Sequence, residues 1–187
     1  MNWTIRIATP ADQESLHELL VRSVTTLHKG CYSESQIRAA IGPVFGVDEQ
    51  MIQDATYFVV EEMGNIVGCG GWSFRKALFG GRQVTGTAPR RLDPETEAAR
   101  IRAFFVDPDF ARQRIGSRIM KACEDAILAA GFRRGEISAT LVGEPLYRRF
   151  GYNTVEHNEI PLAGADPLRV ARMVKTYWNG DPGGAKD

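Results

Sequence analysis

The chain has 187 residues, of which 43% are hydrophobic and 25% charged, which predicts an ordinary globular domain with enough apolar material for one core. Lys plus Arg and Asp plus Glu both number 23, so the formal net charge is zero and no general attraction to nucleic acid or an anionic membrane is expected. The three cysteines lie far apart with no Cys-x-x-Cys pair, which argues against a disulfide framework and favours a cytoplasmic location. No signal peptide or membrane anchor is expected either.

The N-terminal third predicts one strand and two helices. Residues 3–7 alternate between apolar and polar side chains, as a strand with one buried face does. Residues 9–12 contain Thr, Pro and Asp in the order of a helix N-terminus, and leucines follow at helical spacing. A second, shorter helix is predicted over residues 33–41, because a Gly-Pro pair follows it.

The middle of the chain predicts a hairpin and a long connection. Two apolar runs, at residues 56–61 and 66–73, flank the turn dipeptide Gly64-Asn65 and indicate the second and third strands. Residues 76–97 are rich in Gly, Arg, Thr and Pro and show no periodicity. A connection of that length inside a compact domain is usually functional or disordered, so we expect a mobile loop.

The second half of the chain predicts alternating strands and helices. A strand at residues 101–106 precedes a helix that opens at Ile115 and stops at Gly131. Further elements are predicted as a strand at 136–141, a short helix at 145–150 and strands at 154–160 and 168–176. The chain is therefore predicted to form one α/β domain over residues 1–178, with a mixed sheet of about six to seven strands, about four helices and a disordered tail at 179–187.

Positive charge gathers where the long second-half helix begins. A helix N-terminus has unpaired backbone N–H groups and the positive end of the macrodipole. A positive side chain there is unfavourable by about 0.3–1 kcal/mol unless an anion is bound, and three lie at this turn: Arg112, Arg114 and Arg118. Gly116 and Ser117 leave the backbone approachable. This turn alone is equally compatible with an anion site and with a solvated basic surface.

Two motifs decide between these interpretations by resemblance. The run Phe105–Ser117, together with Leu146–Tyr152, resembles the GNAT superfamily of acyl-coenzyme A dependent N-acetyltransferases, and the order of predicted elements matches that family from about residue 4 to residue 177. The resemblance implies a GNAT-like fold, acetyl-coenzyme A (acetyl-CoA) as co-substrate, and transfer of its acetyl group to a primary amine of a small molecule or peptide by direct attack in a ternary complex.

The resemblance also implies roles for individual residues. In the family a loop of the form Gln/Arg-x-x-Gly-x-Gly/Ala binds the pyrophosphate, and its marked places fall here on Ala111, Arg114 and Gly116, of which the first two differ from the pattern. The implied cofactor-binding residues are Phe104, Phe105, Val106, Arg112, Gln113, Arg114, Ile115, Gly116 and Ser117. Phe104 and Val106 would pair with the pantetheine through their main chains, and the N–H of Phe105 or Val106 would polarise the thioester carbonyl.

Tyr147 matches the family's general acid, which protonates the departing thiolate; on spacing alone it would read as a core tyrosine. The general base stays open among the carboxylates near the expected cleft, namely Glu61, Glu62, Glu95, Glu97 and Asp107. Trp72 and Arg75 are weaker candidates for acceptor binding, because a core position and a solvated surface position explain them as well. The three histidines have no ligand spacing, so no metal is expected.

A second interpretation is a non-catalytic acyl-CoA-binding or regulatory module with the same fold. Tyr147 favours the enzyme, and measured turnover would separate the two. A nicotinamide-dependent dehydrogenase is disfavoured because no Gly-x-Gly-x-x-Gly follows an early strand. The family resemblance is also compatible with a homodimer paired through the late strands.

Overall fold

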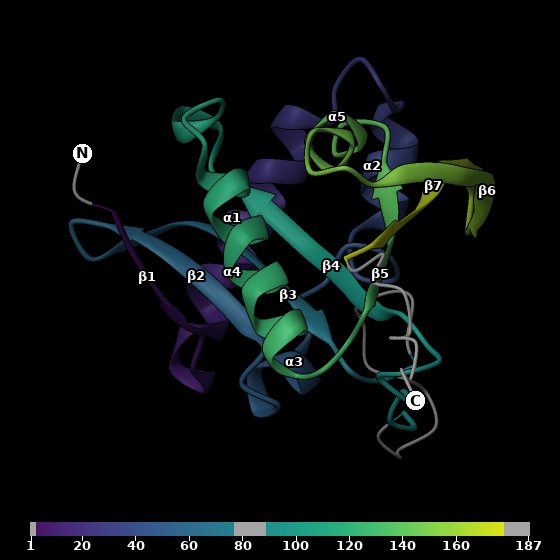
Figure 1. Cartoon of the computed structure of the whole chain (residues 1–187). Helices are drawn as coiled ribbons and strands as arrows, with labels where there is room; N and C mark the ends of the chain where they lie inside the picture. The colour runs from purple at the N-terminus through teal and green to yellow at the C-terminus, as the bar shows by residue number, and fades with distance from the viewer. Residues whose placement is uncertain (1–2, 77–88, 178–187) are drawn as a thin grey trace, which may run out of the picture.

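In a computed structural model that describes residues 3–76 and 89–177, the chain forms a seven-stranded sheet in the order β1-β2-β3-β4-β5-β7-β6 (Figure 1). Neighbouring strands are antiparallel except β4 and β5, which are parallel. The strands are β1 (Trp3–Ile7), β2 (Tyr57–Glu62), β3 (Asn65–Ser73), β4 (Ala99–Val106), β5 (Arg134–Thr140), β6 (Asn153–Leu162) and β7 (Ala165–Thr176). The predicted α/β fold with a mixed sheet is confirmed.

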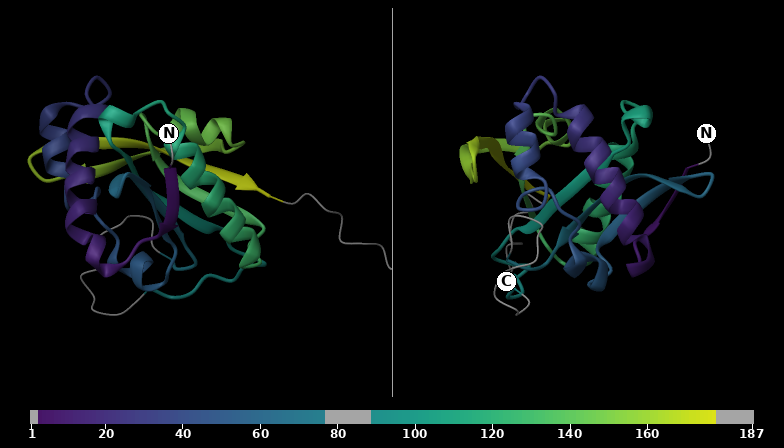
Figure 2. Two further views of the ribbon diagram at one scale, coloured as in Figure 1. Left: turned by 90° about the vertical axis from the view of Figure 1, so that its left-hand side faces the viewer. Right: turned by 180° about the vertical axis from the view of Figure 1, so that it is seen from behind.

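Helices cover both faces of this sheet (Figure 2). One face carries α1 (Gln13–Leu27), α2 (Glu34–Ala40) and α3 (Glu49–Gln53), whereas α4 (Ile115–Ala129) packs on the other; α5 (Glu144–Arg149) follows β5. Short 3₁₀ turns, η1 (Pro10–Asp12) and η2 (Pro108–Phe110), precede α1 and α4. Each face has its own apolar core, because strand side chains alternate between the two faces.

Every strand and helix predicted from the sequence is present, with ends shifted by at most three residues. The hairpin turn lies one residue earlier than predicted, since Met63 and Gly64 have φ values of 50° and 83°. The estimate of about four helices missed α3, which has only five residues. Asp48 is its N-cap, and the Asp48 carboxylate accepts from the N–H groups of Gln50 and Met51.

Two predictions fall largely outside the described residues. The expected mobile loop at 76–97 includes residues 77–88, and the expected disordered tail at 179–187 lies within residues 178–187; neither of these two ranges is described. After the loop, the Leu92 N–H donates to the Phe74 carbonyl at 2.7 Å. The chain therefore returns to the end of β3 before β4 begins. The division into a domain and a tail stays a prediction.

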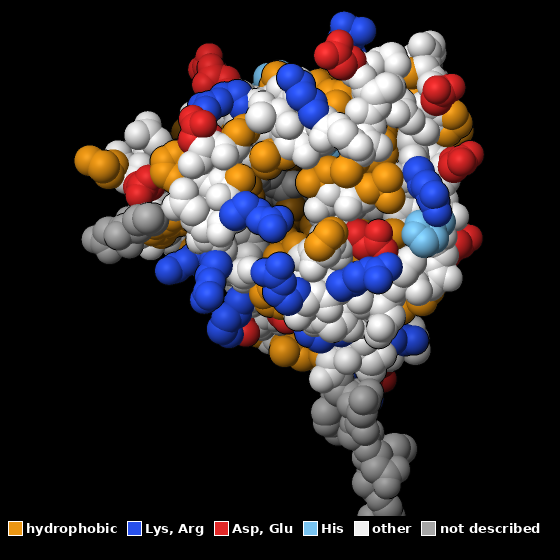
Figure 3. All heavy atoms as spheres, turned by 90° about the horizontal axis from the view of Figure 1, so that it is seen from above, with side chains coloured by type: hydrophobic (Ala, Val, Ile, Leu, Met, Phe, Trp, Pro, Cys, Tyr) orange, Lys and Arg blue, Asp and Glu red, His pale blue; other side chains and the backbone are white. Residues whose placement is uncertain are grey.

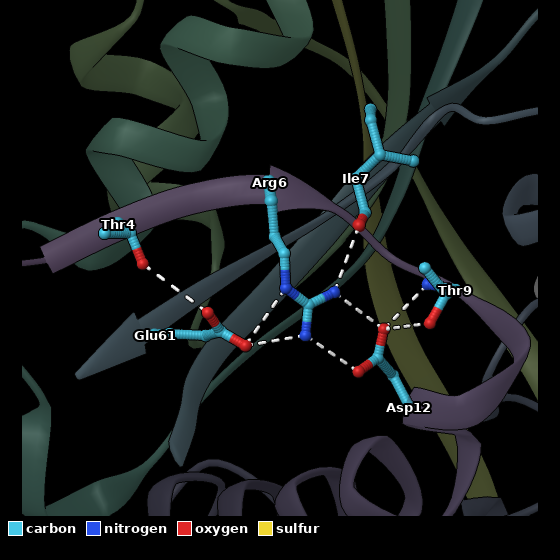
Figure 4. A network of polar contacts seen from close by, with 6 residues as sticks. All are labelled: Thr4, Arg6, Ile7, Thr9, Asp12 and Glu61. Carbon is cyan, nitrogen blue, oxygen red and sulfur yellow. Dashed lines mark hydrogen bonds and ion pairs between the residues drawn. The ribbon is translucent and has the colours of Figure 1, made fainter. Parts of the chain in front are cut away.

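A polar network fixes the start of the chain to the sheet (Figure 4). The Arg6 guanidinium donates to both carboxylate oxygens of Asp12 at 2.8 Å and to Glu61 of β2 at 2.6 Å. Asp12 also accepts from the backbone N–H and hydroxyl of Thr9, the residue that the sequence predicted as the N-cap. One arginine therefore joins β1, β2 and the entry to α1.

Candidate active site

The β4–β5 ladder stops halfway along the sheet. Parallel pairing runs only from Ala99 opposite Gly135 to Ile101 opposite Ile137. Just beyond it, Ala103 has a φ of 59°, and β4 contains one residue more than β3 between two register positions. The Tyr57 hydroxyl holds this bulge by donating to the Ala103 carbonyl at 2.9 Å. The bulge bends β4, so the two strands diverge (Figure 1).

Beyond the bulge, part of the β4 main chain faces the gap. The Asp107 N–H donates to the Val67 carbonyl of β3 at 3.0 Å. The backbone N–H and C=O groups of successive residues in an antiparallel strand point to opposite sides, so those of Val106 point away from β3. Its N–H donates to the Ser23 hydroxyl of α1 at 3.2 Å, and a ligand that needs this N–H would have to displace Ser23. Phe104 and Phe105 pack into the two opposite cores, as adjacent strand residues do.

A pocket of about 480 Å³ occupies the gap between the strands and reaches both faces of the sheet. Seen from above, the surface is hollowed there, with hydrophobic side chains around the opening and Lys or Arg side chains nearby (Figure 3). The pocket lining includes all of the predicted cofactor-binding residues except Gln113, and also Tyr147. Residues separated by more than forty positions in the sequence therefore meet in one cavity.

The N-terminus of α4 forms one wall of this pocket. The first backbone N–H to donate to a carbonyl of this turn is that of Arg118, to Arg114 at 3.1 Å, so the N–H groups of Ile115, Gly116 and Ser117 have no helical acceptor. Arg112 and Arg114 line the same wall, exposed and with φ values of 64° and 68°. Backbone donors, the helix dipole and two guanidinium groups suit a multiply charged anion such as a pyrophosphate.

Gly116 and Gln113 differ in their relation to the pocket. A Cβ on Gly116 would lie 3.1 Å from a methyl group of Leu146, so a larger side chain requires α5 to give way slightly. Gln113 lies outside the pocket lining, and its side-chain amide donates to the Asp109 carbonyl at 3.4 Å. Gln113 therefore stays a predicted cofactor-binding residue that the pocket lining does not include.

Tyr147 lies on α5 at the opposite wall. Its side chain is 4% exposed, and its ring packs edge-on against Phe104 with centroids 5.8 Å apart. Within the described residues its hydroxyl has no hydrogen-bond partner. Burial raises the pKa of Tyr147 well above its usual value, so the hydroxyl stays protonated at neutral pH and can donate to a group in the pocket.

The candidate bases do not line this pocket. Among the described residues, no carboxylate belongs to its lining. Glu61 binds Arg6 at 2.6 Å, Glu97 binds Arg90 at 2.7 Å, and Asp107 binds Arg22 at 3.1 Å. Each of these carboxylates has a structural ion pair, and the choice among the candidates stays open.

The two weaker acceptor-binding candidates lie outside the pocket lining as well. Trp72 is 5% exposed and packs edge-on against Phe74 and Phe132 in the core under α4. The Arg75 guanidinium donates to both carboxylate oxygens of Asp54, at 2.6 and 2.8 Å. Their role in acceptor binding stays a prediction that this pocket does not support.

Two polar residues of the lining, His28 and Arg102, were not predicted from the sequence. Arg102 is buried on β4 and forms an ion pair with Asp48 at 2.6 Å, while burial lowers its pKa and Asp48 opposes that shift. His28 ends α1 and lies 6% exposed between aromatic rings. Neither belongs to a motif; the only sequence signal was an arginine inside an otherwise apolar strand.

Comparisons with known proteins agree with this arrangement. A family model described as an acetyltransferase (GNAT) domain matches residues 53–154, more than half of the chain. No curated protein matches significantly. Within the described residues, no helix is long and apolar enough to cross a membrane.

Solved structures of low sequence identity share the fold. A GCN5-related N-acetyltransferase from Rhodopseudomonas palustris is 19% identical with a TM-score of 0.70, covering 94% of this chain and 96% of its own. The PaiA N-acetyltransferase from Thermoplasma acidophilum, solved with coenzyme A, is 15% identical with a TM-score of 0.65, covering 95% of this chain and 100% of its own. YncA of Salmonella typhimurium, a putative acetyltransferase solved with acetyl-CoA, is 14% identical with a TM-score of 0.63, and both chains are covered completely. This chain therefore belongs to the GNAT acetyltransferase family.

Proposed function

We propose that this protein transfers the acetyl group of acetyl-CoA, the co-substrate of the GNAT family, to a primary amine of a small molecule or peptide. The observation that carries the proposal is the pocket between the diverging strands β4 and β5, which brings a helix N-terminus suited to an anion together with a buried, protonated tyrosine. The similar structures of the PaiA N-acetyltransferase and of YncA were solved with coenzyme A and acetyl-CoA, which supports the same co-substrate here.

The residues of the α4 wall fit the phosphate end of this co-substrate. Backbone N–H groups from Ile115 to Ser117 would donate to the pyrophosphate oxygens, and Arg112 and Arg114 would add positive charge. The main chain of β4 at Val106 and Phe104 would lie along the amide-containing arm, with Val106 exchanging its Ser23 contact for the ligand.

Tyr147 would act at the reacting end. A neutral amine attacks the thioester carbonyl, a C–N bond forms, the C–S bond breaks, and the departing sulfur needs a proton. The Tyr147 hydroxyl lines the pocket, is protonated and has no partner among the described residues, so it can supply that proton and recover one from solvent. An amine and acetyl-CoA bound together then react directly.

The first test is a calorimetric titration of acetyl-CoA into the wild type, Gly116→Gln and Gly116→Glu. Both substitutions crowd Leu146 equally, and only Glu adds a negative charge beside the proposed anion site. We expect Gly116→Glu to bind at least ten-fold more weakly than Gly116→Gln, since ten-fold corresponds to about 1.4 kcal/mol. Equal affinities would place the pyrophosphate elsewhere.

Turnover separates the enzyme from a binding module. Release of coenzyme A thiol is then measured with a panel of primary amines under saturating acetyl-CoA. Acceleration by any acceptor supports the transferase. Saturable binding of acetyl-CoA with no acceleration by any amine favours the non-catalytic acyl-CoA-binding module.

A further inference from the structure

Arginine side chains reach the pocket from both of its walls. Arg112 and Arg114 precede α4, and Arg149 lies on α5. All three are exposed, and within the described residues none of the three guanidinium groups has a hydrogen bond or an ion pair. The fourth arginine of the lining, Arg102, is buried and is paired with Asp48 at 2.6 Å. Since no carboxylate among the described residues lines the pocket, three positive charges meet there without a counter-charge.

The charge on α5 belongs to one face of that helix. Pro145, Leu146 and Arg149 line the pocket, whereas Arg148 does not. Residues three or four positions apart lie on the same side of a helix, which accounts for this pattern. Arg148 points to another side, where its guanidinium donates to the Glu144 carboxylate at 2.7 Å. Arg148 and Arg149 are therefore sequence neighbours of equal charge in different surroundings.

Leu146 places Arg149 beside the start of α4. A Cβ on Gly116 would lie 3.1 Å from a methyl group of Leu146, so α4 and α5 touch at this point. Arg149 follows about one turn later on the same face of α5 and is exposed. Tyr147, on the same short helix, is only 4% exposed and packs against Phe104. The α5 wall thus extends from a buried hydroxyl group to a guanidinium group in solvent.

The charges of the co-substrate indicate what this guanidinium group binds. Coenzyme A carries a pyrophosphate in its middle and a phosphate monoester at the 3′ position of its ribose, at the end remote from the thioester. In the proposed function the pyrophosphate takes the backbone N–H groups at the start of α4. The 3′-phosphate has about two negative charges at neutral pH, as phosphate monoesters do, and needs a separate cation. The planar fork of an arginine matches phosphate oxygens in a bidentate contact.

We propose that Arg149 binds the 3′-phosphate of acetyl-CoA and makes the protein select this donor over acetyl thioesters that lack the phosphate. This inference rests on the proposed function and adds a specificity-determining residue to it. Arg149 takes part in no bond-making or bond-breaking step. Its substitution should therefore weaken donor binding and leave kcat at saturating donor unchanged.

The test compares acetyl-CoA with acetyl-3′-dephospho-CoA, each titrated by calorimetry into the wild type, Arg149→Gln and Arg148→Gln. Both substitutions remove one exposed positive charge from α5, so a general effect of net charge is the same in both. We expect Arg149→Gln to bind acetyl-CoA about ten-fold more weakly than the wild type, which corresponds to about 1.4 kcal/mol. Its affinity for acetyl-3′-dephospho-CoA should stay within two-fold, and Arg148→Gln should stay within two-fold for both donors.

The preference between the two donors is the decisive quantity. The wild type should bind acetyl-CoA at least ten-fold more tightly than acetyl-3′-dephospho-CoA, and Arg149→Gln should reduce this preference to less than three-fold. Equal weakening of both donors would assign Arg149 to the pyrophosphate, and unchanged affinities would leave it in solvent. Either result, or an equal loss in Arg148→Gln, would overturn the inference.

Failure of the two proposals looks different. A wild type that binds neither donor removes the proposed function, and the inference with it. A wild type that binds both donors equally tightly overturns the inference and leaves the proposed function intact. With any amine that the wild type acetylates, Arg149→Gln should raise the KM for acetyl-CoA about ten-fold at unchanged kcat, and a fall in kcat alone would contradict a binding role.

Discussion

Arg114 adopts a backbone conformation that favours glycine. Its φ of 68° and ψ of 14° place it in the left-handed region, directly before α4. The GNAT phosphate loop that this turn resembles has glycine at the position of Arg114. The left-handed backbone conformation is therefore one that suits glycine, although the residue here is arginine. A non-glycine residue there costs about 1–2 kcal/mol. The protein bears this strain and gains a guanidinium beside the pocket.

Substitutions at Arg114 can separate strain from charge. Arg114→Gly and Arg114→Ala both remove the guanidinium, but only glycine relieves the strained φ. We expect the glycine variant to have a free energy of unfolding about 1 kcal/mol higher than the alanine variant, measured by urea denaturation. Both should bind acetyl-CoA about two- to five-fold more weakly than the wild type, as for an exposed charge. Tighter binding by Arg114→Gly would instead mean that the side chain obstructs the site.

Tyr147 allows an equally direct test. Tyr147→Phe keeps the ring against Phe104 and removes the hydroxyl, so we expect kcat to fall about 100-fold while acetyl-CoA affinity stays within two-fold. Tyr152→Phe is the control, since that hydroxyl bonds to Tyr177 and Tyr152 is not part of the pocket lining. An unchanged rate for Tyr147→Phe in steady-state assays would remove Tyr147 from the mechanism.

At the scale of elements, the Arg6 network holds β1, η1 and β2 together. Hydrogen bonds from Arg6 hold the pKa of Asp12 well below its usual range. Because the pKa is lower in the folded state, the stabilising effect is present above the unfolded value of about 3.9 and is lost as the pH falls below it. Hydrogen bonds to charged groups contribute about 1.5–3 kcal/mol, less where one partner is partly exposed, as Arg6 is.

Asp12→Asn should therefore lower the free energy of unfolding by about 1–2 kcal/mol at pH 7. Measured by urea denaturation at several pH values, the difference from the wild type should be constant between pH 8 and about pH 5 and should shrink below about pH 4. Glu14→Gln, an exposed acidic residue in the next turn, should change little. A difference that persists undiminished at pH 3 would mean that Asp12 stabilises the fold by packing and not by charge.

At the scale of the whole molecule, local patterns were enough for most of the fold. The alternation of apolar residues in strands and their helical spacing in helices reflect which side chains the core buries. The predicted and observed ends of these elements therefore agree to within three residues. The resemblance directed attention to Tyr147 and to the start of α4, and the structure brings both to one pocket. Their roles are still proposals.

What the sequence could not predict depends on contacts between distant residues. An alanine with positive φ has no sequence signature, so the bulge at Ala103 was not predicted. Asp48 both starts α3 and pairs with Arg102, which lies over fifty residues away. The candidate bases were chosen from carboxylates near the cleft, but their ion pairs with partners such as Arg6 and Arg22 were not visible in the sequence. His28 was noticed only for lacking metal-ligand spacing.

The short β4–β5 ladder has a consequence for how this protein behaves in a crowded solution. Unpaired strand edges normally lie at the rim of a sheet, where another chain can add to them and start aggregation. Here one such edge lies in the centre of the sheet, between the layers of α1 and α4. The pocket of about 480 Å³ beside it leaves room for a slender, extended ligand, and helices cover the sheet on both faces there. An edge in this place is covered by helices and is therefore less open to an added protein strand than an edge at the rim of the sheet.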